Sequence, residues 1–497
     1  MYQNLPVPLF TTGQARQLDQ AVIRNGTPGI KLMKRAGYAT FQKILSHWPG
    51  LPLTVFCGAG NNGGDGYIVA ALAAEGQLPV RVIQMSSPGK LRGDACTAFE
   101  YARDAGVPMV PFSDCLDLSA GVVVDALLGT GFSGGVREPY AQAIRLINHS
   151  GLPVVSVDVP SGLCANTGAA TGPAVEANLT VTFIALKQGL FTGRGPALCG
   201  ELVYSDLRVS EQILAAEPHP AYRLELDPLR STLLAPRRRD AHKGAFGHVL
   251  VIGGDWGFGG AVSMAAEAAL RVGAGLVSVA TRPEHVAALL ARRPELMVRA
   301  VTSGQQLRPL LARATVLVAG PGLGRSPWSE QLLQQVLDAA LPVVLDADAL
   351  NILSETQLTS GHLPSNWIIT PHPGEAARLL GITVEAVEAD RFAAVRALQQ
   401  TFQCAVVLKG AGSLVCLEPG LPVAVCTGGN PGMASGGMGD VLSGIIGGLI
   451  AQRLSADIAL PLAVCLHAEA ADRAAVEGER GMLATDLLGP LRRLVNP

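Results

Sequence analysis

Short apolar runs alternate along the chain with segments of helical periodicity, and glycine-rich polar loops separate the two. The apolar runs are short enough to be buried strands. They predict strands at 51–57, 79–85, 121–124, 153–157, 249–252, 276–280, 315–319, 342–345, 367–370 and 405–408. Helical spacing predicts two helices within 11–45, another at 261–272 and one that begins at Asp440. This alternation is typical of α/β layers on parallel sheets.

The chain has 497 residues, which is too long for one ordinary core. Prolines gather between 210 and 240, so we place a boundary near residue 220 and expect domains at 1–220 and 221–497. A basic triplet, Arg237 to Arg239, lies in this linker and is expected to be a solvated face.

Charge and cysteine usage narrow the class of protein. The net charge is −2 with no long run of either sign, so no nucleic-acid or membrane partner is expected. The nine cysteines contain no C-x-x-C pair, which favours reduced thiols in the cytoplasm. The first residues lack the basic start and apolar core of a signal peptide.

The first predicted strand runs into a glycine-rich loop, Gly58 to Gly66. Three of its glycines match the G-x-G-x-x-G fingerprint in its strand–turn–helix context. The second strand, 79–85, ends without an acidic residue for a ribose, which argues against a plain Rossmann site. A glycine-rich structural turn is the simpler alternative.

Polar residues follow successive strands of the first half. Loops after the carboxyl ends of parallel strands gather at one crevice, so these residues should converge there. They are Asn62, Asp65, Asp125, Asp158 and Ser161. Each alone would be a cap or turn residue, but three carboxylates at successive strand ends indicate a site. Lys187 could stabilise charge nearby, although a surface lysine is the simpler interpretation.

The motifs N-N-G-G-D-G, D-A-L-L-G-T-G and D-V-P-S-G together resemble the YjeF N-terminal family of NAD(P)H-hydrate epimerases, over residues 8–210. The resemblance implies a Rossmann-like three-layer sandwich with Asp158 as the acid–base residue. It implies hydrate contacts from Asn61, Asn62, Gly63, Gly64, Asp65, Gly129, Thr130, Gly131, Phe132, Ser133, Gly134, Gly135 and Asp158. It also implies K⁺ held by Asn62, Asp125 and Ser161, whose oxygens suit a hard cation.

Polar loops follow the strands of the second half as well. His372 stands between two prolines, where it is either a turn histidine or a rigidly held functional group. Lys409-Gly410 can meet phosphate with a cation and bare N–H groups. Asp346 and Asp348 are candidates for indirect Mg²⁺ contacts or structural caps.

The glycine-rich segment 427–439 leads directly into the predicted helix at Asp440. A helix start offers free N–H groups to an anion. Asp440 is therefore either an N-cap or a carboxylate beside a phosphate site. We expect the helix start to favour its charged form.

The motifs G-P-G-L-G, T-P-H-P-G-E, K-G-A-G-S and G-M-G-D resemble the ribokinase-like YjeF C-terminal family of nucleotide-dependent NAD(P)H-hydrate dehydratases, over residues 225–495. Met438 departs slightly from the G-A-G-D form found in the kinases. The resemblance implies hydrate contacts from Ala261, Gly322, His372 and Asp440, the last as catalytic residue. It implies nucleotide contacts from Lys409, Gly410, Ala411, Gly412, Ser413 and Gly439, with Mg²⁺ and ADP.

Both resemblances in one chain predict a bifunctional repair enzyme for hydrated NADH and NADPH (NADHX and NADPHX). The first domain would interconvert R and S hydrates, and the second would dehydrate the S form with ADP. A homo-oligomer is expected. One alternative is a vitamin-precursor kinase with an accessory nucleotide-binding domain, and another is a nucleotide sensor without turnover.

Overall fold

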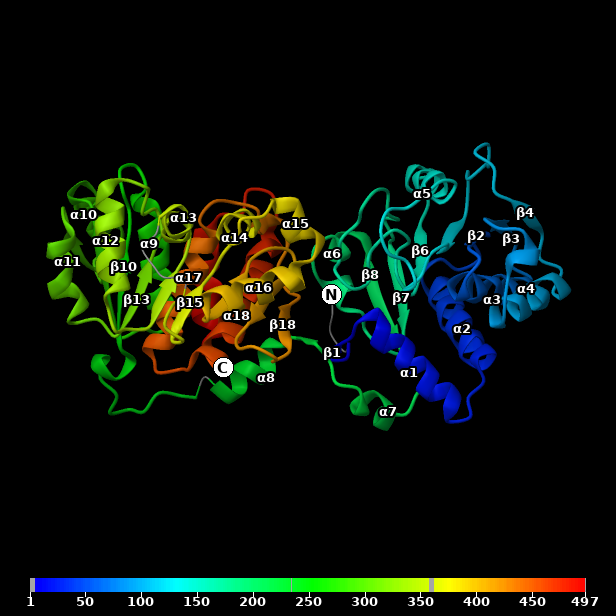
Figure 1. The fold of residues 1–497 in the computed structure, drawn as a ribbon, viewed down its shortest axis with the longest axis horizontal. Helices are drawn as coiled ribbons and strands as arrows, with labels where there is room; N and C mark the ends of the chain where they lie inside the picture. The colour runs from blue at the N-terminus through cyan, green and yellow to red at the C-terminus, as the bar shows by residue number, and fades with distance from the viewer. Residues whose placement is uncertain (1–4, 234, 357–361, 497) are drawn as a thin grey trace. The chain divides into compact units, whose positions relative to one another are not determined.

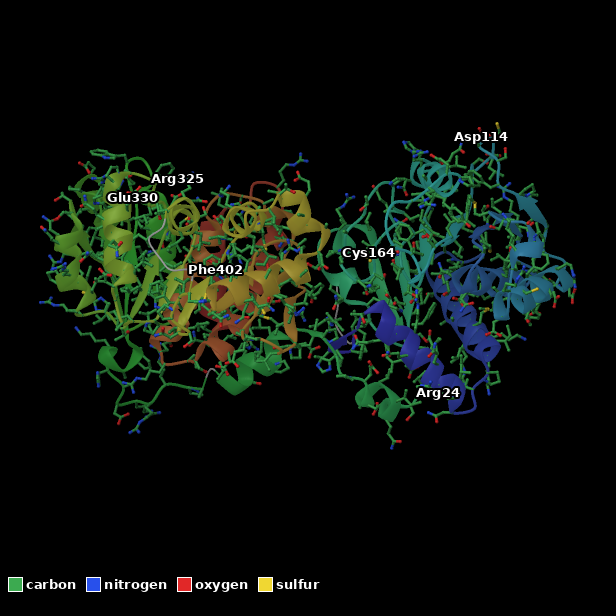
Figure 2. All side chains as sticks on the ribbon, viewed as in Figure 1. Arg24, Asp114, Cys164, Arg325, Glu330 and Phe402 are labelled. Atoms are coloured by element: carbon green, nitrogen blue, oxygen red, sulfur yellow. The ribbon has the colours of Figure 1, made fainter. Side chains whose placement is uncertain are left out.

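The computed structural model describes residues 5–233, 235–356 and 362–496. It divides into two compact units between Tyr222 and Arg223 (Figure 1). Ionisable side chains of both signs project from the surface of each unit, for example Arg24 and Asp114 in the first and Arg325 in the second (Figure 2). Within the described residues, no helix is long and apolar enough to cross a membrane.

The first unit is built on a parallel sheet with the order β4-β3-β2-β5-β6-β7-β8. Its strands are β2 (Leu53–Cys57), β3 (Val80–Gln84), β4 (Met109–Pro111), β5 (Val122–Ala126), β6 (Val154–Val157), β7 (Leu179–Phe183) and β8 (Glu201–Ser205). Separately, β1 (Pro8–Leu9) pairs antiparallel with the start of β9 (Ala221–Arg223). The parallel sheet confirms the predicted fold class for this half.

Two apolar cores lie on opposite faces of this sheet, because successive side chains of a strand point to opposite sides. In β2, Val55 belongs to one core, and its neighbour Phe56 belongs to the other. The larger core contains residues of α1 (Thr12–Arg24), α2 (Gly29–His47), α3 (Asn61–Glu75) and α4 (Asp94–Asp104). The smaller core is covered by α5 (Tyr140–His149) (Figure 1). Short helices α6 (Gly195–Leu198) and α7 (Glu211–Ala216) follow. The result is a three-layer sandwich.

The second unit has a mostly parallel sheet with the order β18-β17-β16-β15-β14-β13-β10-β11-β12. Its strands are β10 (His248–Ile252), β11 (Leu276–Thr281), β12 (Met297–Ala300), β13 (Val316–Ala319), β14 (Val343–Leu345), β15 (Trp367–Ile369), β16 (Ala405–Leu408), β17 (Ser413–Cys416) and β18 (Val423–Cys426). The last two strands run antiparallel to their neighbours. The apolar pattern did not predict them.

The helices of the second unit are α8 (Leu226–Leu233), α9 (Gly259–Arg271), α10 (Val286–Arg292), α11 (Gly304–Leu311), α12 (Pro327–Leu337), α13 (Asp348–Glu355), α14 (Pro373–Leu380), α15 (Val384–Ala389), α16 (Arg391–Phe402), α17 (Met438–Ala451), α18 (Ala456–Ala474) and α19 (Leu488–Leu494). The helix α17 is nearly all buried and packs backbone to backbone on α9. A β-carbon on Gly444 would lie 2.1 Å from the carbonyl oxygen of Ala265. Only glycine permits this approach.

Candidate active sites

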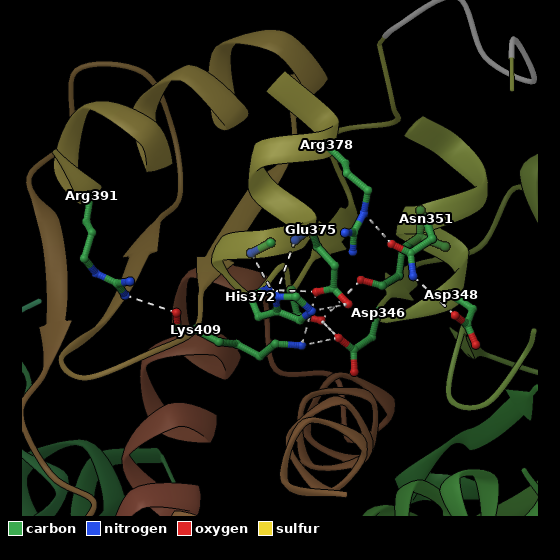
Figure 3. Close-up of polar contacts among 11 residues, drawn as sticks. Asp346, Asp348, Asn351, His372, Glu375, Arg378, Arg391 and Lys409 are labelled. Carbon is green, nitrogen blue, oxygen red and sulfur yellow. Dashed lines mark hydrogen bonds and ion pairs between the residues drawn. The ribbon is translucent and has the colours of Figure 1, made fainter. Parts of the chain in front are cut away.

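A buried ion pair marks the carboxyl edge of the sheet in the second unit (Figure 3). Lys409, directly after β16, places its Nζ 2.6 Å from Oδ1 of Asp346 and 3.7 Å from Oε2 of Glu375. Asp346 is 1% exposed and also accepts a hydrogen bond from Thr370. Burial alone would lower the pKa of Lys409, but the two carboxylates outweigh burial and raise it. The lysine is therefore a fixed cation at the end of the strand.

Asp440 belongs to the same site. Gly437, in the left-handed conformation with φ of 93°, is the N-cap of α17, so Asp440 lies in the first turn rather than at the cap. A β-carbon on Gly439 would lie 3.2 Å from Nζ of Lys409 and 3.6 Å from Oδ2 of Asp346. The start of the helix therefore lies directly against the ion pair.

The charge state of Asp440 differs from the expectation drawn from its helix position. Burial, followed by repulsion from Asp346, raises its pKa to about 7. The helix start was expected to favour the charged form. That expectation was wrong, because desolvation and neighbouring carboxylates outweigh a helix-end effect confined to the first turn. Asp440 consequently titrates near neutral pH, where a general base is most effective.

His372 caps α14, as the turn interpretation suggested. Its Nδ1 accepts hydrogen bonds from the N–H groups of Gly374 and Glu375, and Glu375 accepts one in return from the His372 N–H. Burial and the nearby Lys409 lower the pKa of His372, which favours the neutral ring. Glu375 was not predicted as a site residue. Its spacing three residues after His372 is the capping-box pattern, which could have indicated its place.

A chain of polar contacts links Asp348 to α14 (Figure 3). Asp348 accepts from the N–H of Gly324 at 2.8 Å and from Asn351 at 3.2 Å, and Arg378 donates to Asn351 at 3.0 Å. Asp348 thus holds the loop that contains Gly322. A β-carbon on Gly322 would lie 3.1 Å from Cβ of Ala261, so these two predicted hydrate contacts are neighbours.

In the first unit, Asp158 and Lys187 form a second buried ion pair. Oδ1 of Asp158 accepts hydrogen bonds from Lys187, from Thr182 at 3.1 Å and from the Phe183 N–H at 3.2 Å. The interpretation of Lys187 as a surface lysine was wrong, since the residue is 2% exposed. Asp158 itself adopts φ of 67°, which is unusual for a non-glycine residue and common at functional sites.

Two further acids, Asp65 and Asp19, surround this pair. Burial and the charge of Asp158 raise the pKa of Asp65 well above its usual value. Burial raises the pKa of Asp19 to about 6, although Lys187 opposes the shift. Asp19 was not predicted as a site residue. It lies four residues after Ala15 and three before Val22, on the apolar stripe of α1, and an acid in that position was the available signal.

Asn62 and Ser161 both contact the backbone of Leu128, and Asp125 joins them through Ser161. Asp125 lies within β5 rather than after it, is 0% exposed, and accepts two hydrogen bonds from Ser161. Ser161 accepts from the Leu128 N–H at 2.8 Å, and Nδ2 of Asn62 donates to the Leu128 oxygen at 3.1 Å. Within the described residues, Oδ1 of Asn62 is buried and lacks a hydrogen-bond partner.

Comparison with known proteins identifies the family. A family model described as YjeF-related protein N-terminus matches residues 29–189, and one described as NAD(P)H-hydrate dehydratase matches residues 249–493. A Coxiella burnetii protein named bifunctional NAD(P)H-hydrate repair enzyme is 52% identical over 98% of this chain and 99% of its own length. The chain belongs to the family of bifunctional NAD(P)H-hydrate repair enzymes. An Escherichia coli protein of the same name is 45% identical over 94% of this chain and 90% of that protein.

Membership in the repair family confirms the predicted activity: the chain is an epimerase and a dehydratase for hydrated NADH and NADPH. The kinase alternative is not favoured, because relatives named for repair match both units.

Solved structures confirm the ribokinase-like fold of the second unit. A ribokinase-like superfamily protein from Enterococcus faecalis is 32% identical with a TM-score of 0.50, over 55% of this chain and 94% of that one. A hypothetical protein from Streptococcus mutans is also 32% identical with a TM-score of 0.51, over 55% of this chain and 98% of that one.

The loops that should bind the hydrate and the nucleotide in this repair enzyme differ in how firmly they are held. Residues Asn61 to Asp65 form the first turn of α3, and a β-carbon on Gly63 would lie 2.1 Å from the Gly58 oxygen. Close packing thus accounts for glycine there, as the structural-turn alternative proposed. In the loop Gly129–Gly135, Gly129 adjoins Asn62, whereas residues 133–135 are exposed.

The predicted nucleotide loop, residues 409–413, rests on a buried arginine. Arg391 is 1% exposed, donates to the Lys409 oxygen at 3.1 Å and pairs with Glu388 at 2.9 Å. Gly410 adopts φ of 140°, and the Ser413 hydroxyl donates to the Gly410 oxygen. The buried Arg391 therefore holds the backbone of this turn in place.

Proposed function

We propose that dehydration of the S hydrate takes place where Asp440 meets the Lys409–Asp346 pair, and that it depends on ADP. The observation that carries the proposal is the carboxylate of Asp440, with its pKa near 7, on a glycine-rich turn packed against a buried cation. Lys409 and the N–H groups of the turns at 410–413 and 437–440 are the phosphate-binding elements. Asp440 orients the substrate hydroxyl and accepts its proton.

The nucleotide has a chemical purpose in this scheme. Hydroxide is a poor leaving group. A phosphoryl group transferred from ADP to the hydroxyl oxygen, with AMP as the leaving group, makes the later elimination easier. Loss of phosphate, with a ring proton, then restores the dihydronicotinamide. Ala261, Gly322 and His372 line the hydrate side of the site in this proposal.

Magnesium fits this site as a companion of the nucleotide. Among the described residues, no group of three or more histidine, cysteine or acidic side chains could hold a metal ion. Mg²⁺ commonly binds substrate phosphates with one or two carboxylates and water. Asp346 and Asp348 would be those carboxylates, and the ion would neutralise phosphate charge.

Epimerisation is assigned to the cluster around Asp158 in the first unit. The ring nitrogen of the hydrate expels the hydroxyl, and water adds again to the iminium from either face. Asp158, ion-paired with Lys187, is the proton acceptor, and Asp65 is the proton donor, since burial and the charge of Asp158 raise its pKa. Carboxyl groups in different surroundings can supply an acid and a base in one site.

K⁺ fits beside this cluster, because the buried Oδ1 of Asn62 has no protein partner in the described parts of the chain. Asn62, Asp125 and Ser161 would hold the cation, which would supply a fixed positive charge to the phosphates of the hydrate. Cytoplasmic localisation and a homo-oligomer stay predictions, as do the hydrate contacts of the loop 129–135.

One assay tests both assignments. A mixture of R and S hydrates of NADH is given to the full chain with and without ADP, and absorbance of the restored dihydronicotinamide is followed. We expect complete conversion with ADP and none without it. If conversion stops once the S hydrate has been consumed and the R hydrate remains, the result contradicts epimerisation. Conversion without ADP would contradict the nucleotide's role.

A further inference from the structure

A second pocket of the dehydratase unit lies at the opposite ends of the helices that begin in the active site. It has a volume of about 550 Å³ and is lined by the last residues of α9, by Gln452 after α17, and by the end of α19. The helix α17 has 14 residues, so at about 1.5 Å per residue its two ends are about 20 Å apart. The pocket is therefore distinct from the site around Asp440.

Arginines dominate the lining of this pocket. Within the described residues, five arginines line it and an adjoining hollow, namely Arg237, Arg271, Arg293, Arg492 and Arg493. Two carboxylates oppose them: Glu295 in the lining and the buried Glu267, which pairs with Arg271 and Arg293. Arg492 and Arg493 form no ion pair with any carboxylate in the parts of the chain that the structure describes.

Helix ends do not balance the remaining charge. Arginines often lie in the last turn of a helix because that end carries about half a negative charge. The ends of α9, α17 and α19 reach this pocket. Counted over the described residues alone, these ends and the two carboxylates leave more than one positive charge of the five arginines uncompensated. Arg237, moreover, belongs to no helix.

Arg237 is held in place before any ligand arrives. Its guanidinium lies 3.6 Å from the centre of the Phe246 ring and donates to Oε1 of Gln452 at 2.9 Å. The prediction that the basic triplet is a solvated face is confirmed, since Arg237, Arg238 and Arg239 are all exposed, and Arg238 pairs with Asp240 at the surface. The pocket thus combines a preorganised guanidinium with an apolar wall that includes Phe246 and Leu270.

We propose that this pocket binds a small molecule that carries a pyrophosphate group. Several guanidinium groups in one pocket match the adjacent phosphates of such a ligand, and arginine binds phosphate oxygens in pairs. The volume is in the range of small-molecule sites, and the apolar wall would contact the organic part. Nucleoside diphosphates and dinucleotides share this chemistry.

Calorimetry on the full chain tests the proposal, with inorganic pyrophosphate as the probe, at low salt and without added nucleotide, so that ADP does not occupy the pocket. Arg492→Glu reverses one exposed charge of the pocket that pairs with no carboxylate among the described residues. We expect it to weaken pyrophosphate binding at least tenfold and to leave the dehydration rate unchanged. Arg239→Ala, an exposed arginine next to Arg238, is the control and should bind as the parent does.

Displacement distinguishes the possible sources of the ligand. AMP, ADP and NADH are each titrated against bound pyrophosphate, and displacement by ADP or NADH but not by AMP supports recognition of two linked phosphates. Equal displacement by AMP would overturn the specificity for pyrophosphate. Equal affinity in the parent and in Arg492→Glu, or no heat in the parent at millimolar probe, would overturn the site itself.

Discussion

Both units place a buried lysine–aspartate pair at the carboxyl edge of a parallel sheet, but the pairs differ in what the lysine holds. In the first unit, Lys187 pairs with Asp158, which is the proposed acid–base residue itself. In the second, Lys409 pairs with Asp346, and Asp440 lies beside the pair on another element. The lysine is thus a direct partner of the reacting carboxylate in one site and a neighbour of it in the other.

This difference determines which carboxyl group titrates near neutral pH. In the dehydratase unit, Asp346 takes the strongest contact with the lysine, and Asp440 is left with a pKa of about 7. In the epimerase unit, Asp158 takes that contact, and the raised pKa values fall on Asp65 and on Asp19, which reaches about 6. A buried cation among several acids therefore separates their roles.

The largest effect is expected from Asp440→Asn, which keeps the shape of the side chain and removes the base. General-base contributions are about 10²–10⁴-fold, so we expect a loss of that size in the dehydration rate, with epimerisation untouched. Turnover is measured at saturating ADP and S hydrate. Asp457→Asn, in the first turn of α18 and exposed, is the matched control. Turnover of Asp440→Asn within threefold of the parent would reduce Asp440 to a structural residue.

Lys187→Met should damage the epimerase unit in two ways. It leaves Asp158 buried without its cation, which costs on the order of 3 kcal/mol of stability. We also expect epimerisation to slow about a hundredfold while the dehydration of purified S hydrate continues. Thermal melting and both assays are compared with Lys31→Met, an exposed lysine. Parent-like melting and epimerisation would show that the ion pair has no part in the reaction.

The pH dependence of dehydration should report Asp440. As a base with a pKa of about 7, it must lose its proton, so kcat/KM should fall about tenfold for each pH unit below 7. Its pKa is raised in the folded state, so the stability it contributes is present at acid pH and is lost as pH rises through 7. Relative to the parent, Asp440→Asn should therefore gain on the order of 2 kcal/mol of stability between pH 5 and pH 8. If kcat/KM did not change between pH 5 and pH 8, the result would contradict the assignment of Asp440 as the general base.

The smallest effect concerns the cation of the epimerase unit. Asn62→Ala removes the buried oxygen without a protein partner, so epimerisation should lose its severalfold stimulation by K⁺ over a large organic cation. Asn61→Ala, one residue earlier and exposed, should raise KM for the hydrate and keep the K⁺ response. Equal K⁺ responses in Asn62→Ala and the parent would place the cation elsewhere.

Sequence patterns predicted strands and loops well where burial alone decides the element. The run at 405–408 became β16 without change, because an apolar stretch after a helix has few other places to pack. The hairpin of β17 and β18 was missed although its strands are as long as β16, because no helical segment separates these three strands and the expected alternation of strands and helices does not include them. Its antiparallel pairing is local, since Leu408 pairs with Leu414 and Ser413 with Cys426, so the turns between these strands were the available signal.

Site residues were predictable from their position after a strand, but their charge states were not. Lys187 was considered from the sequence as a possible charge-stabilising group, whereas its burial depends on the tertiary contacts of its Nζ with Asp158 and Thr182. Asp19 illustrates the same limit, because nothing within α1 shows which acids will surround it. Desolvation and charge coupling are tertiary properties, so a linear pattern carries only indirect traces of them.

The glycine contact between α17 and α9 has a consequence for protein engineering. The Gly444 backbone lies on the Ala265 carbonyl, and this contact opposes rotation of α17 about its axis. The orientation of Asp440 is therefore set by a contact four residues further along the helix. The loop before the helix can then be redesigned for another substrate without turning the carboxylate aside. If the loop and Asp440 were transplanted into a scaffold that lacks this glycine contact, the reacting groups would be present but the orientation of the carboxylate would not be fixed.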